Sequence, residues 1–267
     1  MSGTAQSSFS IPDDDALIAS ALEEASIPTL MMSMIHMSGD ASLLDGAIRP
    51  AGVFINEYQG YMSEEDKATV RARALEMIKN FRDGGCQLPS SPSPATIHRM
   101  MNFIVAGDVP EDYVPMMLEE MELDGIDQRS DACSDEVPAK ARAQHKVLVI
   151  GGGMSGVLAA YRLQEAGIPF VVIEKNSAVG GTWFENRYPG ARVDVGNHLY
   201  SYSFEPAHHW TQYFSQQKEL QQYFEGVVYH HQLEQHFRFN TEVTSAVFDE
   251  INKEWIVNTV YKDGVEE

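Results

Sequence analysis

The sequence predicts an α/β protein in which a Rossmann-like domain follows an all-α N-terminal extension. Three observations support this fold class. Apolar residues recur at helical spacing before residue 140, composition changes near that position, and a strand, a glycine turn, a helix and a second strand then follow in order. With 267 residues, 43% of them hydrophobic and 22% charged, the chain has an ordinary globular composition and room for two domains.

Charge and cysteine content exclude several classes of protein. The formal net charge of −20 disfavours binding to nucleic acid or to an anionic membrane surface. The N-terminus is polar and then acidic, unlike a signal peptide, and no apolar run reaches the length of a membrane span. Cys86 and Cys133 form no disulfide framework. We therefore expect a soluble, cytoplasmic protein.

The composition divides the chain into residues 1–140 and residues 141–267. The first part carries a net charge of −15 and 12 of the 13 methionines, whereas the second carries −5. We predict that residues 1–140 form an acidic helical extension and that a second domain begins at residue 141. Helical patterns in the extension cover five segments: Asp13–Ser26, Pro28–Gly39, Ser63–Phe81, Ala95–Val105 and Tyr113–Leu123.

The methionines of the extension permit two interpretations. They could form an adaptable binding surface, or they could fill the core of a helix bundle, which is the commoner use. The residues concerned are Met31, Met32, Met34, Met37, Met100, Met101, Met116, Met117 and Met121.

A dinucleotide-binding pattern opens the second part. The apolar run Lys146–Ile150 is typical of a buried parallel strand, and the sequence Gly-Gly-Gly-Met-Ser-Gly of residues 151–156 follows directly. A helical pattern over Val157–Ala166 then leads to a second apolar strand, Pro169–Ile173, which ends in Glu174.

Each position of this pattern has a physical role. Gly151 permits a tight turn, Gly153 allows a pyrophosphate to approach the backbone, and Gly156 allows helix and strand to pack closely. The helix N-terminus attracts the phosphates, and Glu174 can accept hydrogen bonds from ribose hydroxyls. Because a carboxylate repels a 2′-phosphate, the pattern favours FAD or NAD over NADP. A glycine turn without a ligand and a methyltransferase-type domain are the alternatives.

A second motif separates these alternatives. Val179-Gly-Gly-Thr-Trp183 is followed by Tyr188-Pro-Gly190 and by Asp194. Together these residues resemble the long fingerprint of the Baeyer–Villiger monooxygenases, which are class B flavoprotein monooxygenases. The resemblance implies a Rossmann-like FAD-binding domain of the ββα type with a β-meander. The N-terminal extension further resembles that of the 4-hydroxyacetophenone monooxygenase group.

The resemblance implies roles for individual residues. Glycines and neighbours of the first turn would contact the FAD pyrophosphate, Glu174 the ribose, and Thr182 and Trp183 the flavin. Asp194 would be a catalytic residue, with Tyr200 beside it, and Arg192 would face the nicotinamide cofactor. Val243 would lie near the adenine. The full cofactor-binding set is Gly151, Gly153, Met154, Ser155, Gly156, Glu174, Gly181, Thr182, Trp183, Arg192, Asp194, Tyr200 and Val243.

In such enzymes NADPH reduces FAD, and the reduced flavin reacts with dioxygen to a C4a-peroxide that converts a ketone into an ester or lactone. The resemblance therefore implies FAD and NADPH as cofactors, and dioxygen and a ketone, here an aryl ketone, as small-molecule substrates. A homodimer formed through the extension would fit its apolar helical faces.

The end of the sequence departs from the family pattern. A helix is expected around Lys218–His231, with strands at Phe239–Phe248 and Trp255–Tyr261. No second glycine fingerprint for NADPH and no candidate for a catalytic arginine follows. We therefore expect residues 141–267 to be the first part of an FAD-binding domain, the chain to be an N-terminal fragment, and the fragment alone to be inactive.

The histidines His208, His209, His230, His231 and His236 lack the spacing of a metal site, so no metal is predicted. The alternative to an enzyme is a non-catalytic interaction module, Met1–Lys140, joined to a vestigial dinucleotide site.

Overall fold

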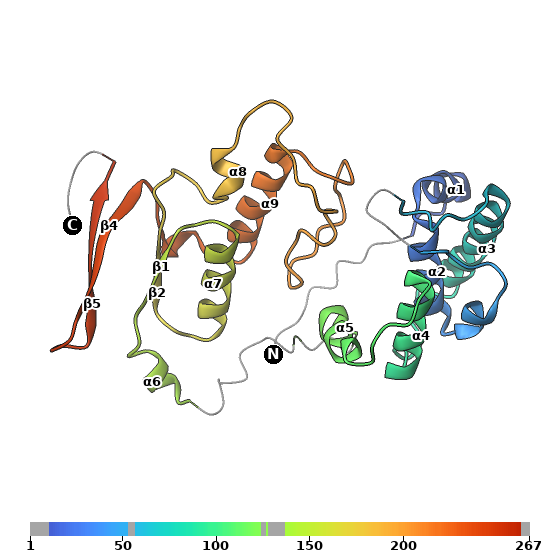
Figure 1. Cartoon of the computed structure of the whole chain (residues 1–267), viewed down its shortest axis with the longest axis horizontal. Helices are drawn as coiled ribbons and strands as arrows, with labels where there is room; N and C mark the ends of the chain where they lie inside the picture. The colour runs from blue at the N-terminus through green and yellow to red at the C-terminus, as the bar shows by residue number, and fades with distance from the viewer. Residues whose placement is uncertain (1–10, 53–56, 124–126, 128–136, 263–267) are drawn as a thin grey trace. The chain divides into compact units, whose positions relative to one another are not determined.

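The chain forms two compact units, Met1–Ile126 and Asp127–Glu267. The computed structural model describes residues 11–52, 57–123, 127 and 137–262 (Figure 1). Helices fill the first unit, and the second combines helices with a parallel sheet. The predicted fold class is confirmed. The domain boundary placed between residues 140 and 141 stays a prediction.

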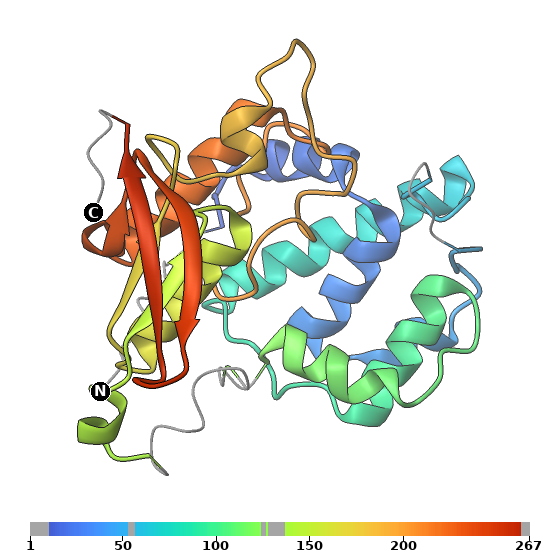
Figure 2. The same ribbon diagram turned by 60° about the vertical axis from the view of Figure 1, so that its left-hand side comes forward.

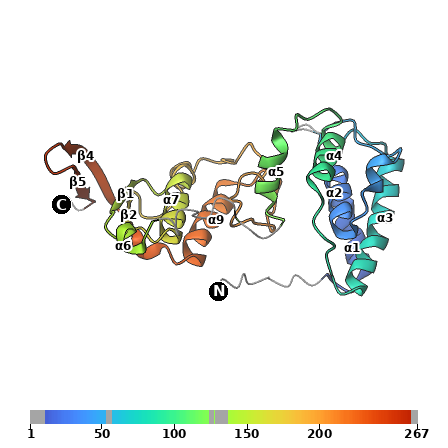
Figure 3. The ribbon, with the colours of Figure 1, turned by 90° about the horizontal axis from the view of Figure 1, so that it is seen from below.

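The first unit is a bundle of helices at the predicted positions (Figure 3). Helix α3 packs against α1 and α2, and α4 packs against α2 and α5. The elements are α1 (Asp15–Glu24), α2 (Ile27–Ser38), the 3-10 helix η1 (Ala41–Asp45), α3 (Glu64–Asp83), α4 (Pro94–Val105) and α5 (Tyr113–Met121).

Local sequence explains where these helices begin and end. Ser63 caps α3, since its Oγ accepts a hydrogen bond from the Asp66 N–H at 3.1 Å. Gly39 ends α2 in the left-handed conformation, with φ of +71°. Arg71 of α3 donates to the carbonyl oxygens of Leu22 and Glu23, so it also caps the C-terminal end of α1.

Methionines belong to the core of this unit. Met31, Met34 and Met100 are at most 5% exposed and pack among the buried leucines and isoleucines of the bundle. Met116 is 47% exposed. The packing of the three buried side chains agrees with the helix-bundle interpretation rather than with a binding surface.

The second unit is built on three parallel strands in the order β1-β2-β3. Strands β1 (Val147–Ile150) and β2 (Phe170–Ile173) pair with each other in parallel. Helix α7 (Met154–Glu165) connects them in the sequence. The third strand, β3 (Phe237–Arg238), pairs in parallel with β2. The sequence patterns did not predict β3, because two residues carry too little periodicity to be recognised. The order matches one half of a doubly wound sheet.

Strand β1 is less buried than its apolar sequence predicts. Val147 and Val149 are half-buried, whereas Leu148 is 37% and Ile150 62% exposed. Successive residues of a strand point to opposite faces, and in the described part of the chain α7 covers only one of them. The expectation of a strand buried on both faces is therefore wrong for these residues.

Helix α9 and a hairpin complete the second unit. Helix α9 (Gln217–His230) packs against α7 and against the short helix α8 (Thr182–Glu185). Strands β4 (Thr241–Asp249) and β5 (Glu254–Tyr261) form an antiparallel hairpin, seen as the two long red strands in Figure 2. The remaining elements are α6 (Ala139–Arg142) and the 3-10 helix η2 (Glu234–His236).

Candidate functional site

The first glycine turn joins β1 to α7. Gly151 has φ of +97°, a conformation that favours glycine, and its N–H donates to the Ile173 carbonyl of β2 at 2.8 Å. Gly153 is the N-cap residue of α7 and offers no side chain to cap the helix. The first backbone N–H groups of α7 are therefore left for a ligand, at the positive end of the helix dipole.

Gly156 allows the helix to lie against this turn. A Cβ atom at position 156 would lie 1.9 Å from the carbonyl oxygen of Gly151. That distance is far below van der Waals contact. The clashing atom belongs to the backbone, so a change of side-chain rotamer cannot relieve the clash. The close approach predicted for this glycine is present in the structure.

Glu174 lies at the end of β2 and faces the same turn. Its side chain is 3% exposed. One carboxylate oxygen accepts the Gly152 N–H at 2.5 Å, and the other accepts the Asn176 N–H at 2.7 Å. Each oxygen keeps a further lone pair, so the carboxylate can still accept a hydrogen bond from a ribose hydroxyl.

The second glycine turn, Gly180–Gly181, packs directly on the first. The Gly180 N–H donates to the Gly152 carbonyl at 2.9 Å. A Cβ atom at Gly181, where φ is +52°, would lie 2.9 Å from the Cα of Gly153. Two motifs whose contacting glycines are 28 residues apart in the sequence therefore form one continuous glycine surface. Thr182, which is exposed, starts α8 beside it.

Aromatic side chains follow the second turn. Trp183 is 8% exposed, and its Nε1–H donates to the Tyr200 hydroxyl at 3.1 Å. The two rings meet edge to face, with centroids 5.9 Å apart. The structure thus brings together two of the residues that the resemblance assigns to the flavin.

Tyr202 was not among the predicted site residues. Its hydroxyl donates to the Met154 carbonyl in the first turn of α7, at 2.5 Å. Burial raises the pKa of Tyr202 far above its usual value, so the phenol stays protonated and remains a donor. The alternation of aromatic residues at Tyr200, Tyr202 and Phe204 is the signal in the sequence that could have indicated it.

Arg192 and Asp194 share the outward side of an extended segment. Ala191 and Val193 are 4% and 3% exposed and anchor this segment in the core, whereas Arg192 and Asp194 are exposed. Backbone hydrogen bonds join the segment to residues 215–217: the Val193 N–H donates to Ser215, and the Gln217 N–H to Ala191. The two charged side chains thus alternate with the core anchors, as in a strand.

Asn197 fixes the end of this segment. It is completely buried, and its Nδ2 donates to the Gln212 carbonyl and to Ser215 Oγ, each at 2.6 Å. Its Oδ1 accepts the Ser215 N–H at 3.0 Å. Ser215 Oγ in turn donates to Glu219. Burial opposes ionisation of Glu219, but hydrogen bonds from Ser215 and Thr211 outweigh it, so the pKa of Glu219 lies below its usual value.

Replacing Asn197 by alanine should destabilise the second unit. Several buried groups would lose a partner, and each unpaired group costs about 1–3 kcal/mol, so we expect the free energy of unfolding to fall by at least about 2 kcal/mol. Trp183, Trp210 and Trp255 all lie in this unit, so urea unfolding followed by tryptophan fluorescence reports on it alone. The exposed Asn258→Ala is the control. Equal unfolding midpoints for both variants would contradict the structural role of Asn197.

Val243 lies in β4, outside the two glycine turns. A backbone hydrogen bond joins the start of β4 to Glu174: the Thr241 N–H donates to the Glu174 carbonyl at 3.0 Å. A strand irregularity falls between Val243 and Ser245. Met154 is half-buried and Ser155 exposed, both in the first turn of α7.

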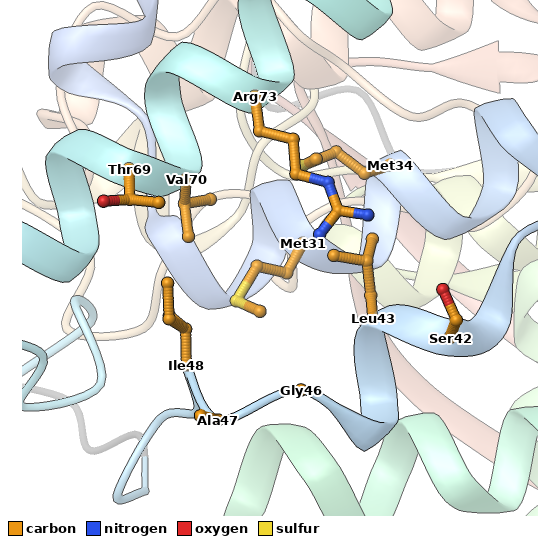
Figure 4. Close-up of a pocket in the computed structure, with 10 residues that line it drawn as sticks. All are labelled: Met31, Met34, Ser42, Leu43, Gly46, Ala47, Ile48, Thr69, Val70 and Arg73. Carbon is orange, nitrogen blue, oxygen red and sulfur yellow. The ribbon is translucent and has the colours of Figure 1, made fainter.

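A separate cavity of about 190 Å³ lies in the helical unit (Figure 4). Its lining is mostly apolar, with Met31, Leu43 and Val70 among the residues, and Arg73 of α3 extends across it. Hydrogen bonds from Ser42 hold the pKa of Asp40 below its usual value, and the charge of Arg73 adds to this effect. The carboxylate of Asp40 therefore compensates part of the positive charge of Arg73.

Two negative findings concern the described part of the chain. Within residues 11–52, 57–123, 127 and 137–262, no three histidine, cysteine, aspartate or glutamate side chains are grouped to hold a metal ion. None of the helices in these ranges has the length and apolar character needed to cross a membrane.

Some known proteins match nearly the whole chain, and others match less than half of it. The family model of an NAD(P)-binding Rossmann-like domain matches residues 149–216, which include both glycine turns. An uncharacterized monooxygenase, y4iD, of Sinorhizobium fredii is 32% identical over 94% of this chain and 37% of its own length. A Baeyer–Villiger monooxygenase of Streptomyces coelicolor is 44% identical over 43% of this chain and 22% of its own length. Over this part, the chain is homologous to proteins named Baeyer–Villiger monooxygenase.

Solved structures of monooxygenases match a similar share of the chain. An oxidized steroid monooxygenase bound to NADP is 40% identical over 46% of this chain and 24% of that chain, with a TM-score of 0.42. The chain thus spans between about a fifth and two fifths of the length of these relatives. Because the y4iD match covers 94% of the chain, it includes most of the helical unit, which this relative therefore shares.

Proposed function

We propose that the second unit binds FAD and serves an NADPH-dependent monooxygenase that performs Baeyer–Villiger oxidation of ketones. The observation that carries this proposal is the surface formed by the two glycine turns, with the buried carboxylate of Glu174 beside it. Homology supports FAD over NAD, since relatives that are 40–42% identical are named FAD-binding monooxygenases.

The residues present fit the adenosine and pyrophosphate parts of FAD. The free N–H groups at the start of α7 would bind the pyrophosphate, and Gly156 keeps that helix start close to the turn. Glu174 would accept hydrogen bonds from the ribose. When bound, FAD supplies the redox chemistry and the reaction with dioxygen, while the chain binds and orients it.

The residues after the second turn fit the flavin end. We propose that Trp183 and Tyr200 line the flavin, with their mutual hydrogen bond fixing both rings. Arg192 and Asp194 are presented on one exposed side of their segment and would face the reacting part of the cofactors. Asp194 is the proposed catalytic residue among them.

We also propose a substrate class and an activity for these 267 residues alone. We infer an aryl ketone from the resemblance of the acidic helical extension to that of the 4-hydroxyacetophenone monooxygenase group. The 267 residues contain a single glycine fingerprint, which serves one dinucleotide, so we place most of the NADPH site outside them. We therefore infer that these residues alone bind FAD without oxidising ketones. A homodimer formed through the extension stays a prediction.

A flavin-loading experiment tests this function. The purified chain is mixed with FAD, freed of unbound cofactor by gel filtration, and examined by visible absorbance. We expect flavin bands in the protein fraction and no ketone-dependent oxidation of NADPH with 4-hydroxyacetophenone. A protein fraction without flavin would refute the proposed function and favour the alternative of a vestigial site. Ketone-dependent NADPH oxidation would refute the inference that these residues are inactive alone.

A further inference from the structure

Two glutamine side chains of α9 hold the two ends of the second glycine turn. Gln221 Nε2 donates to the Val179 carbonyl at 2.6 Å, directly before Gly180. Gln217 Nε2 donates to the carbonyl of Trp183, two residues after Gly181. Because Gln217 and Gln221 are four residues apart, they lie on the same face of the helix. We refer to these two side-chain amides as the amide clamp.

The burial of Gln221 is unusual for its residue type. Glutamine is mostly exposed in proteins, yet Gln221 is only 8% exposed. Its Nε2 also donates to Glu225 at 2.8 Å, but its Oε1 is buried without a hydrogen-bond partner. An apolar side chain of similar size would avoid burying this unpaired oxygen. Core packing alone therefore does not account for a glutamine at this position.

Gln221 also touches the turn itself. A Cβ atom at Gly180, where φ is +120°, would lie 2.0 Å from Gln221 Oε1. On its other side the turn rests on the first glycine turn, through the Gly180 N–H bond to Gly152 and the close approach of Gly181 to Gly153. The contacts run without interruption from α9 to the residues that would hold the pyrophosphate.

We propose that Gln217 and Gln221 are positioning residues for the cofactor. The amide clamp fixes the Gly180–Gly181 turn against Gly152 and Gly153 before the cofactor arrives, so binding does not have to order the turn. A preorganised site loses less entropy on binding and therefore has a higher affinity. This inference rests on the proposed function, because the ligand whose affinity it sets is FAD.

The test uses Gln221→Met and, as a matched control, Gln222→Met. Gln222 is the next residue of the same helix and is exposed. Gln221→Met leaves the buried Val179 carbonyl without its side-chain donor, but it also removes the unpaired buried oxygen. These two effects oppose each other, so we expect only a small change in the unfolding midpoint. The dissociation constant for FAD should rise about tenfold, while Gln222→Met leaves it unchanged.

Amide hydrogen exchange of residues 178–183 provides a readout that does not depend on FAD. Faster exchange in Gln221→Met, without a change elsewhere in the unit, is the expected result for a turn that has lost its clamp. If the wild type binds FAD and Gln221→Met binds it equally well, the inference is wrong. If the wild type takes up no FAD, both the proposed function and this inference fail. Unchanged amide exchange of residues 178–183 in Gln221→Met would separately refute the ordering of the turn by Gln221.

Discussion

Gly156→Ala is expected to weaken FAD binding severely. The added Cβ would lie 1.9 Å from the Gly151 carbonyl oxygen, so either the start of α7 or the glycine turn must move. Overpacking of this kind costs about 1–3 kcal/mol and occasionally more, and a shifted turn no longer presents its N–H groups to the pyrophosphate. We expect the FAD dissociation constant to rise more than about 100-fold. Titration of FAD followed by flavin fluorescence measures it.

Gly226→Ala is the matched control for this variant. Gly226 lies inside α9, and a Cβ atom there would meet no atom within 4 Å. The substitution should raise the stability of the second unit by about 0.4–1 kcal/mol, because alanine restricts the unfolded chain. Wild-type affinity for FAD in Gly156→Ala would show that the close approach of helix and turn is not needed for the cofactor.

Glu174→Lys is expected to have the second large effect. The buried carboxylate accepts the N–H groups of Gly152 and Asn176, and a lysine would place an unpaired cation beside those same donors. Each buried N–H group left without its acceptor costs about 1–3 kcal/mol, and burial of the lysine charge adds to this cost. The ribose would also lose its acceptor, so we expect FAD affinity to fall at least about 100-fold, with a lower unfolding midpoint in urea.

A milder substitution separates the ribose contact from the folding defect. Glu174→Gln keeps the size of the side chain and one acceptor oxygen, so the unit should fold while FAD binds about tenfold more weakly. Glu250→Lys, which reverses the charge of an exposed glutamate at the hairpin turn, is the control. Unchanged FAD affinity in both Glu174 variants would contradict the role of this residue at the ribose.

Local patterns were sufficient to predict much of this molecule. The glycine positions and the acid at the end of β2 depend on backbone geometry within about thirty residues, and the structure has the expected turn, helix and strand there. The helices of the first unit likewise follow from spacing and from end signals such as Ser63 and Gly39. Neither the cofactor nor the roles of Asp194 and Arg192 follow from these patterns without the resemblance.

Features that depend on distant contacts could not be predicted in this way. Gln221 lies 42 residues from Val179, and Tyr202 lies 48 residues from Met154, so only the fold brings them together. Strand β3 is recognisable only through its pairing with β2. The exposed Leu148 and Ile150 show the reverse case, in which an apolar sequence predicted more burial than the described elements provide.

The most direct test of the central claim is a comparison of FAD, ADP and FMN as ligands of the wild-type chain by isothermal titration calorimetry. The glycine surface and Glu174 are assigned to the adenosine diphosphate half of FAD, which ADP shares and FMN lacks. We predict that FAD binds at one site, that ADP competes with it, and that FMN binds at least about 100-fold more weakly. Absence of FAD binding, or binding of FMN as tightly as FAD with no competition by ADP, would contradict the account.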